Sequence, residues 1–316
     1  MQLVVMGTGP FAVPMFQALA RSDHQLLALV TRPDRRAGGR KPVPNPMREA
    51  AATLNIPVLD PEDINQPHAR QQLEELQPDL LVVCDYGQIL SAEILQVAPL
   101  GGINLHGSLL PRYRGAAPVQ WAIIHGESTT GISVIHMTPR LDAGPCLVQQ
   151  STPIGQQEDA GQLEPRLALL GVDPVIEAIT MLGKWDGRSD IGIAQLEEHA
   201  SPAPRLHRQD GVIDWSQSAI QIADRIRGLK PWPGSFTHWL RDADPQRLII
   251  EQVQVAVATS RHTPGQVLDL DAEGIHVATG DGLIVITQLK PAGKRTMTSA
   301  DFLRGYPLAA GNLLGS

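Results

Sequence analysis

Short, almost wholly apolar runs recur through the first third of this 316-residue chain, and they constrain its fold more than any other feature. They span residues 2–6, 25–30, 80–84 and 100–105, and Leu, Val and Ile dominate them. A strand that is apolar at successive positions must be buried on both faces, which is typical of parallel sheets covered by helices. Segments with helical spacing separate these runs. The pattern predicts an α/β fold with an open, mainly parallel Rossmann-like sheet and helices on both faces.

The pattern changes after about residue 184, where Gly, Asp, Ser and Pro become frequent. Beyond an expected helix at 219–229, short strand-like runs are separated by turns such as Thr279-Gly280-Asp281-Gly282. Closely spaced short strands favour a small barrel. We therefore predict an N-terminal domain over 1–186, a linker over 187–206 and a smaller C-terminal β-barrel domain, OB-like, over 207–316.

Composition narrows the functional class. No run reaches the roughly 20 apolar residues that a membrane helix needs, and the first residues lack the basic segment of a signal peptide. The only cysteines, Cys84 and Cys146, lie in apolar contexts without metal-ligand spacing, as expected in a reducing compartment. We therefore expect a cytoplasmic protein that makes no membrane contact. We also expect it to be a monomer and to use no metal.

Two segments contain the most informative polar residues. Asn104 and His106 stand two apart at the end of the expected strand 100–105, so their side chains should project to the same side. An amide donor beside an imidazole can stabilise an oxyanion and move a proton. Asp142, in a turn, could orient the imidazole or accept a proton. Because no Ser or Cys is placed to form a covalent triad, the trio suits direct attack on a carbonyl by an amine or by water.

The turn Gly7-Thr8-Gly9-Pro10-Phe11-Ala12 matches a loose dinucleotide-binding fingerprint, with Arg32 as a candidate 2′-phosphate contact. Pro10, however, removes one of the amides that would hold a pyrophosphate. We favour a plain strand–helix turn over an NADP-dependent reductase.

Two loops could bind ligands. Residues 108–115 combine Pro, Gly and two Arg, which suits an anionic or planar ligand, and residues 85–90 could form the opposite wall. The chain carries a net charge of −7, yet residues 32–41 form an Arg-rich island. Guanidinium groups bind phosphates well, so this island is a candidate contact to a polyanion.

The motif Asn104-x-His106-x-Ser108-Leu109-Leu110-Pro111-x-x-Arg114-Gly115-x-x-Pro118, with Leu141-Asp142-x-Gly144, resembles the signature of the 10-formyltetrahydrofolate-dependent formyltransferase family. The resemblance runs nearly end to end. It implies transfer of a formyl group from 10-formyltetrahydrofolate, with Asn104, His106 and Asp142 as catalytic residues. It also implies a set of folate-binding residues: Tyr86, Gly87, Gln88, Ile89, Leu90, Ser108, Leu109, Leu110, Pro111 and Gly115.

The Arg-rich island at 32–41 and the segments 210–215, 225–234 and 293–297 resemble the branch of this family that acts on initiator methionyl-tRNA. The resemblance implies formylation of that tRNA for translation initiation. It implies tRNA contacts from a basic set: Arg35, Arg36, Arg40, Lys41 and Lys294. Gly107, Asp85 and Ser91 depart from the family pattern, the last two at the expected folate wall.

Other acceptors fit the same signature. A formyltransferase acting on a nucleotide-linked amino sugar, a formyltetrahydrofolate hydrolase and a non-catalytic RNA-binding protein remain alternatives. In the favoured interpretation, the methionine amine attacks the formyl carbon while Asn104 and protonated His106 donate hydrogen bonds to the formyl oxygen. Asp142 is expected to favour the protonated imidazole.

Overall fold

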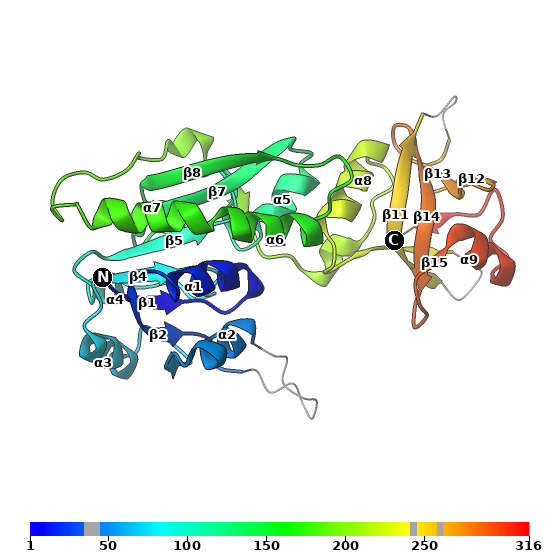
Figure 1. Cartoon of the computed structure of the whole chain (residues 1–316). Coiled ribbons are helices and arrows are strands. Elements are labelled where there is room, and N and C mark those ends of the chain that lie inside the picture. Colours follow the sequence, from blue (N-terminus) through cyan, green and yellow to red (C-terminus); the bar gives the residue numbers. More distant parts are fainter. Residues whose placement is uncertain (35–44, 241–244, 258–261, 316) are drawn as a thin grey trace. The chain divides into compact units, whose positions relative to one another are not determined.

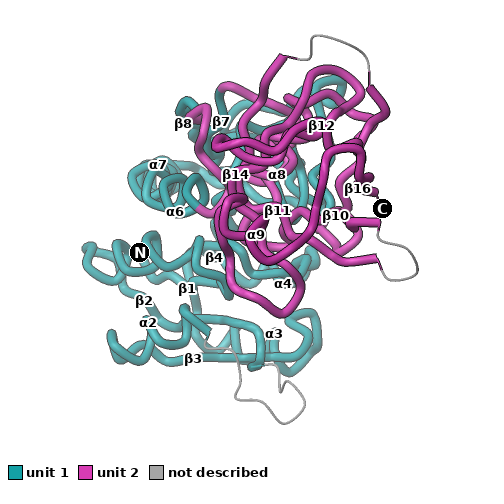
Figure 2. Tube along the Cα trace, turned by 90° about the vertical axis from the view of Figure 1, so that its right-hand side faces the viewer, with its two compact units in different colours: residues 1–118, 129–153, 162–204 teal, residues 119–128, 154–161, 205–316 magenta. Residues whose placement is uncertain are grey.

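The computed structural model describes residues 1–34, 45–240, 245–257 and 262–315. The chain forms two compact units (Figure 2). Unit 1 comprises residues 1–118, 129–153 and 162–204, and unit 2 comprises residues 119–128, 154–161 and 205–316. Most of the predicted linker therefore belongs to unit 1. Within the described ranges, no helix combines the length and the apolar character needed to cross a bilayer.

Unit 1 is built on a mixed sheet with the strand order β3-β2-β1-β4-β5-β7-β8 (Figure 1). β1 to β5 pair in parallel, whereas β7 and β8 join antiparallel at one edge. The predicted open, mainly parallel sheet is confirmed. The strands are β1 (Gln2–Met6), β2 (Gln25–Val30), β3 (Val58–Leu59), β4 (Leu80–Val83), β5 (Gly102–His106), β7 (Thr129–His136) and β8 (Cys146–Pro153).

Both faces of this sheet are covered. Successive residues Leu3, Val4, Val5 and Met6 of β1 are all fully buried, although they point alternately to opposite faces. One face packs against α3 and α4, and α7 contacts β7, β8 and α1. The helical segments of unit 1 are η1 (Pro10–Ala12), α1 (Val13–Leu19), α2 (Pro46–Leu54), α3 (Pro67–Leu76), α4 (Ala92–Leu95), α6 (Ala160–Leu170), which begins in unit 2, α7 (Val172–Leu182) and η2 (Glu197–His199).

Helix ends follow local chemistry in most places. Asn45 caps α2 by accepting hydrogen bonds from the amides of Met47 and Arg48, as expected of Asn before Pro. The segment 162–182 has helical spacing in which Pro165 predicts a break, but Pro165 lies inside α6. A proline there removes one backbone bond, and the buried side chains of Leu163 and Leu167 keep the helix docked. The break falls instead at Gly171, between α6 and α7.

The spacing of apolar residues in the segment 115–125 predicts a helix throughout, but α5 (Pro118–Ile124) begins three residues later. The reason is a short parallel pair, in which β6 (Arg114–Gly115) pairs with β9 (Pro202–Ala203). The amide of Ala117 also donates to the carbonyl of Ala203. Contacts with residues 88 positions away therefore override the local helical pattern.

The glycine turn after β1 is a structural turn. The amides of Thr8 and Gly9 donate to the carbonyl of Asp85 at 3.0 and 3.4 Å, and Gly7 donates to Val30 at 2.9 Å. These amides are therefore already bonded within the protein, so they are not free to hold a pyrophosphate. The geometry supports the plain strand–helix turn.

Unit 2 carries an antiparallel sheet with the strand order β12-β13-β14-β11-β10-β16, and β15 pairs with β14. Its two edges meet, because Val267 N donates to Asn312 O at 2.9 Å and Leu314 N donates to Gly265 O at 2.8 Å. The predicted β-barrel is thus confirmed as a curled sheet whose ends are hydrogen-bonded. The elements are η3 (Arg208–Gly211), α8 (Ala219–Gly228), β10 (Ser235–Trp239), β11 (Gln246–Ala256), β12 (Val267–Leu270), β13 (Ile275–Ala278), β14 (Leu283–Pro291), β15 (Met297–Thr298), α9 (Ser299–Gly305) and β16 (Leu314–Gly315).

Candidate active site

The three residues singled out from the sequence meet at one place in unit 1. Asn104 and His106 lie on β5, and Asp142 lies in the turn between β7 and β8. Asn104 Nδ2 donates to Asp142 Oδ1 over 3.4 Å, and His106 Nδ1 lies 3.6 Å from Asp142 Oδ2. The His106 and Asp142 side chains are only 5% and 9% exposed, whereas Asn104 is half-buried. The cluster is thus largely enclosed but accessible from the Asn104 side.

The hydrogen bond on the far side of the His106 ring defines its role. Nε2 lies 2.8 Å from the carbonyl oxygen of Tyr113, which can only accept, so Nε2 must carry a proton. In a neutral ring Nδ1 would then turn its lone pair toward the Asp142 carboxylate. Nδ1 is therefore the ring nitrogen that faces the Asp142 carboxylate.

Backbone geometry holds the Asp142 carboxylate. The amide of Gly115 donates to Asp142 Oδ2 at 2.9 Å, in addition to the approach of His106. Asp142 itself has φ +48°, in the left-handed region that non-glycine residues rarely occupy. Such conformations cluster at functional sites, where the surrounding contacts maintain them.

The loop 108–115 rests on a buried polar scaffold. Ser133 Oγ, fully buried on β7, donates to Ser108 O at 2.7 Å and accepts from Leu110 N at 3.0 Å. Gln149 Nε2 donates to Ser133 Oγ and to Leu110 O, at 2.8 and 2.9 Å. The backbone amide and carbonyl of Leu110 are therefore both hydrogen-bonded within the protein. Its side chain packs in a small apolar cluster. This scaffold sets the path that brings Tyr113 and Gly115 to the trio.

A second group, which the sequence interpretation missed, lies behind the Asp142 turn. Gln195 Nε2 donates to Asp142 O and Gly144 O at 2.8 and 2.7 Å. Its Oε1 accepts from the Arg114 guanidinium at 2.8 and 3.1 Å. Arg114 also pairs with Glu197, and its hydrogen bond, together with its charge, lowers the pKa of that carboxyl. Gln195 lies 53 residues from Asp142, and no spacing pattern in the sequence signals the contact.

The predicted folate wall at 86–90 follows β4 and has two kinds of residue. Tyr86 and Leu90 are buried in the core of unit 1, so their side chains face away from solvent. Gln88 is tied to Ile64 N and Glu62 O, whereas Gly87 and Ile89 are exposed. Val83 of β4 is in register with Asn104 of β5, so this segment emerges beside the strand that carries the trio. A ligand at this edge would meet Gly87 and Ile89.

Asp85, which departs from the family pattern, begins this segment with φ +48°. Its carboxylate packs so closely over Gly9 that a Cβ at Gly9 would overlap it. Asp85 as a whole is an exposed residue, but burial of its carboxylate and the nearby Glu164 raise the pKa of Asp85 to about 7. Burial also raises the pKa of Glu164. Two carboxyl groups with raised pKa values therefore lie in unit 1, outside the trio.

The predicted tRNA contacts are only partly visible. Arg35, Arg36, Arg40 and Lys41 lie outside the described residues. Lys294 is exposed in the turn between β14 and β15. Among the described residues, the only cluster with metal-ligating side chains within reach of one another is in unit 2, where Asp271 and Glu273 lie in the turn after β12 and His276 lies on β13.

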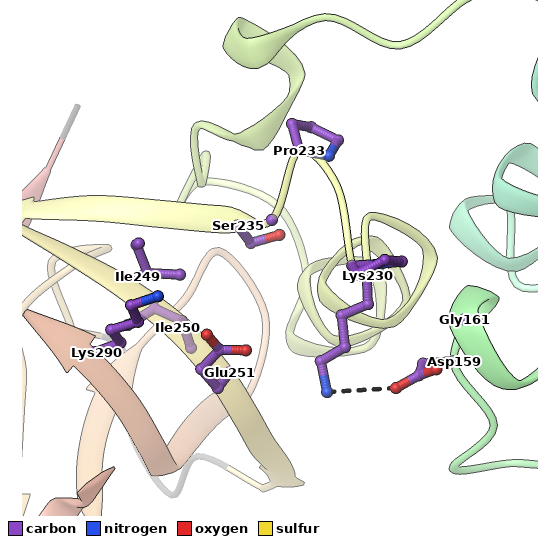
Figure 3. A pocket seen from close by; sticks show the side chains of 11 residues that line it. Asp159, Gly161, Lys230, Pro233, Ser235, Ile249, Ile250, Glu251 and Lys290 are labelled. Atoms are coloured by element: carbon purple, nitrogen blue, oxygen red, sulfur yellow. Dashed lines mark ion pairs between the residues drawn. The ribbon is translucent and has the colours of Figure 1, made fainter. Parts of the chain in front are cut away.

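Unit 2 also contains a pocket of about 660 Å³ (Figure 3). On the wall of the pocket, Lys230 Nζ lies 3.5 Å from Asp159 Oδ2. Lys290 and Glu251 also line the pocket, from the adjacent strands β14 and β11. The buried hydroxyl of Ser235 has no hydrogen-bond partner among the described residues. The carboxylates balance the ammonium groups, so the pocket has no strong charge preference.

Comparison with known proteins defines the class of this chain. The formyl transferase family model matches residues 1–179, and the model of the formyl transferase C-terminal domain matches residues 205–307. The chain therefore belongs to the formyl transferase family. Solved structures share the fold: an N-formyltransferase from Helicobacter canadensis superposes with a TM-score of 0.65 at 16% identity, covering 90% of this chain and 97% of that one. A glycinamide ribonucleotide transformylase from Symbiobacterium toebii gives a TM-score of 0.51 at 21% identity, over 62% and 94%.

Curated relatives narrow the class further. A methionyl-tRNA formyltransferase from Rhodopirellula baltica is 45% identical, covering 99% of this chain and 96% of its own length. The methionyl-tRNA formyltransferase from Pelobacter propionicus is 42% identical, with the same two coverages. Within the formyl transferases, the chain groups with the methionyl-tRNA formyltransferases.

Proposed function

We propose that this protein transfers the formyl group of 10-formyltetrahydrofolate to the free amine of initiator methionyl-tRNA, giving formylmethionyl-tRNA for translation initiation. The observation that carries the proposal is the convergence of Asn104 Nδ2 and His106 Nδ1 on the Asp142 carboxylate. An amide donor, an imidazolium and a carboxylate around one small space suit the addition of an amine to a formyl carbon. Full-length relatives named for this reaction support the acceptor.

The first step is the attack of the neutral methionine amine on the formyl carbon, which forms a C–N bond and places negative charge on the formyl oxygen. Asn104 Nδ2–H and His106 Nδ1–H donate to that oxygen. A well-placed donor of this kind is worth about 3 kcal/mol of barrier. Both nitrogens now make only long contacts with Asp142, at 3.4 and 3.6 Å, so a substrate oxygen can take the donors at little cost.

The second step breaks the bond between the formyl carbon and N10 of the folate. The proton lost by the attacking amine must reach N10, which leaves as a neutral amine. Asp142 accepts this proton, directly or through a water, and passes it on to N10. Oδ2 stays aligned throughout, because the Gly115 amide donates to it. In this proposal hydrogen-bond donors stabilise the charge and Asp142 carries the proton, so the reaction needs no metal.

The folate donor belongs at the sheet edge between segments 86–90 and 108–115. Exposed Gly87 and Ile89 and the half-buried Leu109 can face a flat pteridine, and holding it supplies orientation to the reaction. The tRNA phosphates would meet Arg35, Arg36, Arg40 and Lys41, with Lys294 on unit 2. Arg40→Ala should therefore weaken use of tRNA and reduce the salt dependence of binding.

The acceptor is tested by offering the protein each candidate. Charged initiator tRNA and 10-formyltetrahydrofolate should give formylmethionine after ester hydrolysis, whereas a nucleotide-linked amino sugar should remain unmodified. Release of formate without an acceptor would indicate the hydrolase instead. Formylation of the amino sugar but not of the tRNA would overturn the proposal.

A further inference from the structure

Gln195 closes a circuit of contacts around Asp142. Gly115 holds the Asp142 carboxylate through its amide, and Arg114, the preceding residue, donates two hydrogen bonds to Gln195 Oε1. Gln195 Nε2 returns to the carbonyls of Asp142 and Gly144. Gly115 thus holds the side chain of Asp142 directly, and its neighbour Arg114 holds the backbone of Asp142 through Gln195.

These contacts stabilise a turn whose backbone conformation is unfavourable. Asp142 has φ +48°, and Gly144 packs so closely on His136 that a Cβ there would overlap the His136 carbonyl. Leu141 and Ala143, which flank Asp142 in the turn, are exposed and half-buried, so burial of their side chains contributes little to holding it. The amide of Gln195 is the side-chain group that bonds to two carbonyls of this turn.

The chemistry of the amide is specific. Nε2 has two protons for two carbonyls, and Oε1 has two lone pairs for the two Arg114 nitrogens. A glutamate of the same shape could still accept from Arg114, but it would turn a carboxylate oxygen toward both carbonyls. We propose that Gln195 is a positioning residue that sets the place of the Asp142 carboxylate relative to His106 and Asn104. This inference rests on the proposed function, because it assigns the reaction to that carboxylate.

The test compares Gln195→Glu and Gln195→Ala with Gln150→Ala, whose exposed glutamine lies on β8 of the same unit. Both Gln195 variants should lower kcat about 10- to 100-fold, as small displacements of a reacting group do. The KM values for folate and tRNA should stay within about twofold, because the mispositioned group does not bind the ground state. Gln150→Ala should match the parent protein. An unchanged kcat, or an equal rise in KM, would overturn the proposal.

A double-mutant cycle shows whether the effect passes through Asp142. In an Asp142→Asn background, Gln195→Glu should cost little more, because the group that it positions has lost its function. Multiplicative losses would overturn the proposal.

Amide hydrogen exchange provides a readout that does not depend on the acceptor. In Gln195→Glu, exchange should accelerate at Gly115, whose amide is bonded to Asp142, and remain unchanged in β1. If wild-type protein fails to formylate methionyl-tRNA but this exchange still rises, the proposed function fails while the positioning role stands. Unchanged exchange at Gly115 would refute the positioning role itself.

Discussion

The carbonyl oxygen of Tyr113 lies 2.8 Å from Nε2 of His106, and this contact orients the imidazole within the trio. The acceptor belongs to the backbone, so it has no proton to give and commits Nε2 to donation. Nδ1 then faces Asp142. The loop 108–115 therefore sets which nitrogen of His106 would take part in the proposed reaction.

Removal of either donor of the trio should abolish turnover without preventing binding. We expect Asn104→Ala and His106→Ala to lower the single-turnover rate of formyl transfer by about 10²- to 10³-fold each, because each loses one hydrogen bond to the oxyanion. Filter binding of charged tRNA should change less than about twofold. Rapid quench followed by detection of formylmethionine measures the rate, and near-normal transfer by either variant would show that its side chain is not a donor.

Gly115 should not tolerate a side chain. Its φ is +130°, and a Cβ would lie 2.5 Å from the carbonyl oxygen of Ala203. We expect Gly115→Ala to lower the free energy of unfolding by about 2 kcal/mol or more and to reduce transfer, since the amide that holds Asp142 moves. Gly187→Ala is the matched control, with φ +72° and no described atom within 4 Å. Denaturant unfolding of both variants decides the matter, and equal losses would contradict the steric argument.

The hydroxyl of Ser133 should stabilise the catalytic loop. Ser133→Ala leaves the buried Leu110 amide without its acceptor, which costs about 1–3 kcal/mol. The loop 108–115 should then show faster amide exchange and transfer should slow. Ser151→Ala, at an exposed serine on the neighbouring strand, should have no effect. If exchange in the loop is unaltered in Ser133→Ala, other contacts hold its path.

Stability should depend on pH through Asp85. Its pKa in the folded protein is about 7, above the ordinary 3.8, so the folded state retains a proton that the unfolded chain releases. Stability should therefore fall as pH rises from about 4 to about 7 and level off above that. The exposed part of Asp85 is screened by solvent, which makes the effect smaller than the shift alone would give.

Asp85→Asn should flatten this slope and be more stable than wild type above about pH 7. Asp190→Asn, at an exposed aspartate of the same unit, serves as the control. Urea unfolding at several pH values measures the difference. Curves for wild type and Asp85→Asn that run parallel would show that Asp85 does not titrate in this window.

Lys294 should contribute to RNA binding through charge alone. Lys294→Ala is expected to weaken tRNA binding and to reduce the slope of log K against log salt by about 1, whereas Lys294→Arg should restore both. Lys184→Ala, an exposed lysine of unit 1, tests for a general effect of charge. A slope that is the same in all three variants would remove Lys294 from the RNA contact surface.

Sequence patterns predicted the sheet because apolar runs such as 80–84 have no stable place except between two helical layers. They also predicted Asn104 and His106 together, since strand periodicity puts both on one side. They did not predict Gln195, Ser133 or the carbonyl of Tyr113, whose roles come from hydrogen bonds to backbone atoms. Such bonds depend on the path of the chain, and neither the type nor the spacing of the residues reports that path. The helix expected from residue 115 was wrong for the same reason, since β9 pairs there.

The pairing of β6 with β9 also determines where the chain can be divided. A fragment that stops at residue 186, the predicted end of the N-terminal domain, would lack both the partner strand of Gly115 and the amide of Gln195. Such a fragment could retain the whole parallel sheet, but the turn that carries Asp142 would be held less firmly. A fragment that is to keep the proposed active site intact therefore has to extend through residue 204. The segment 187–204 thus contributes to the geometry of that site.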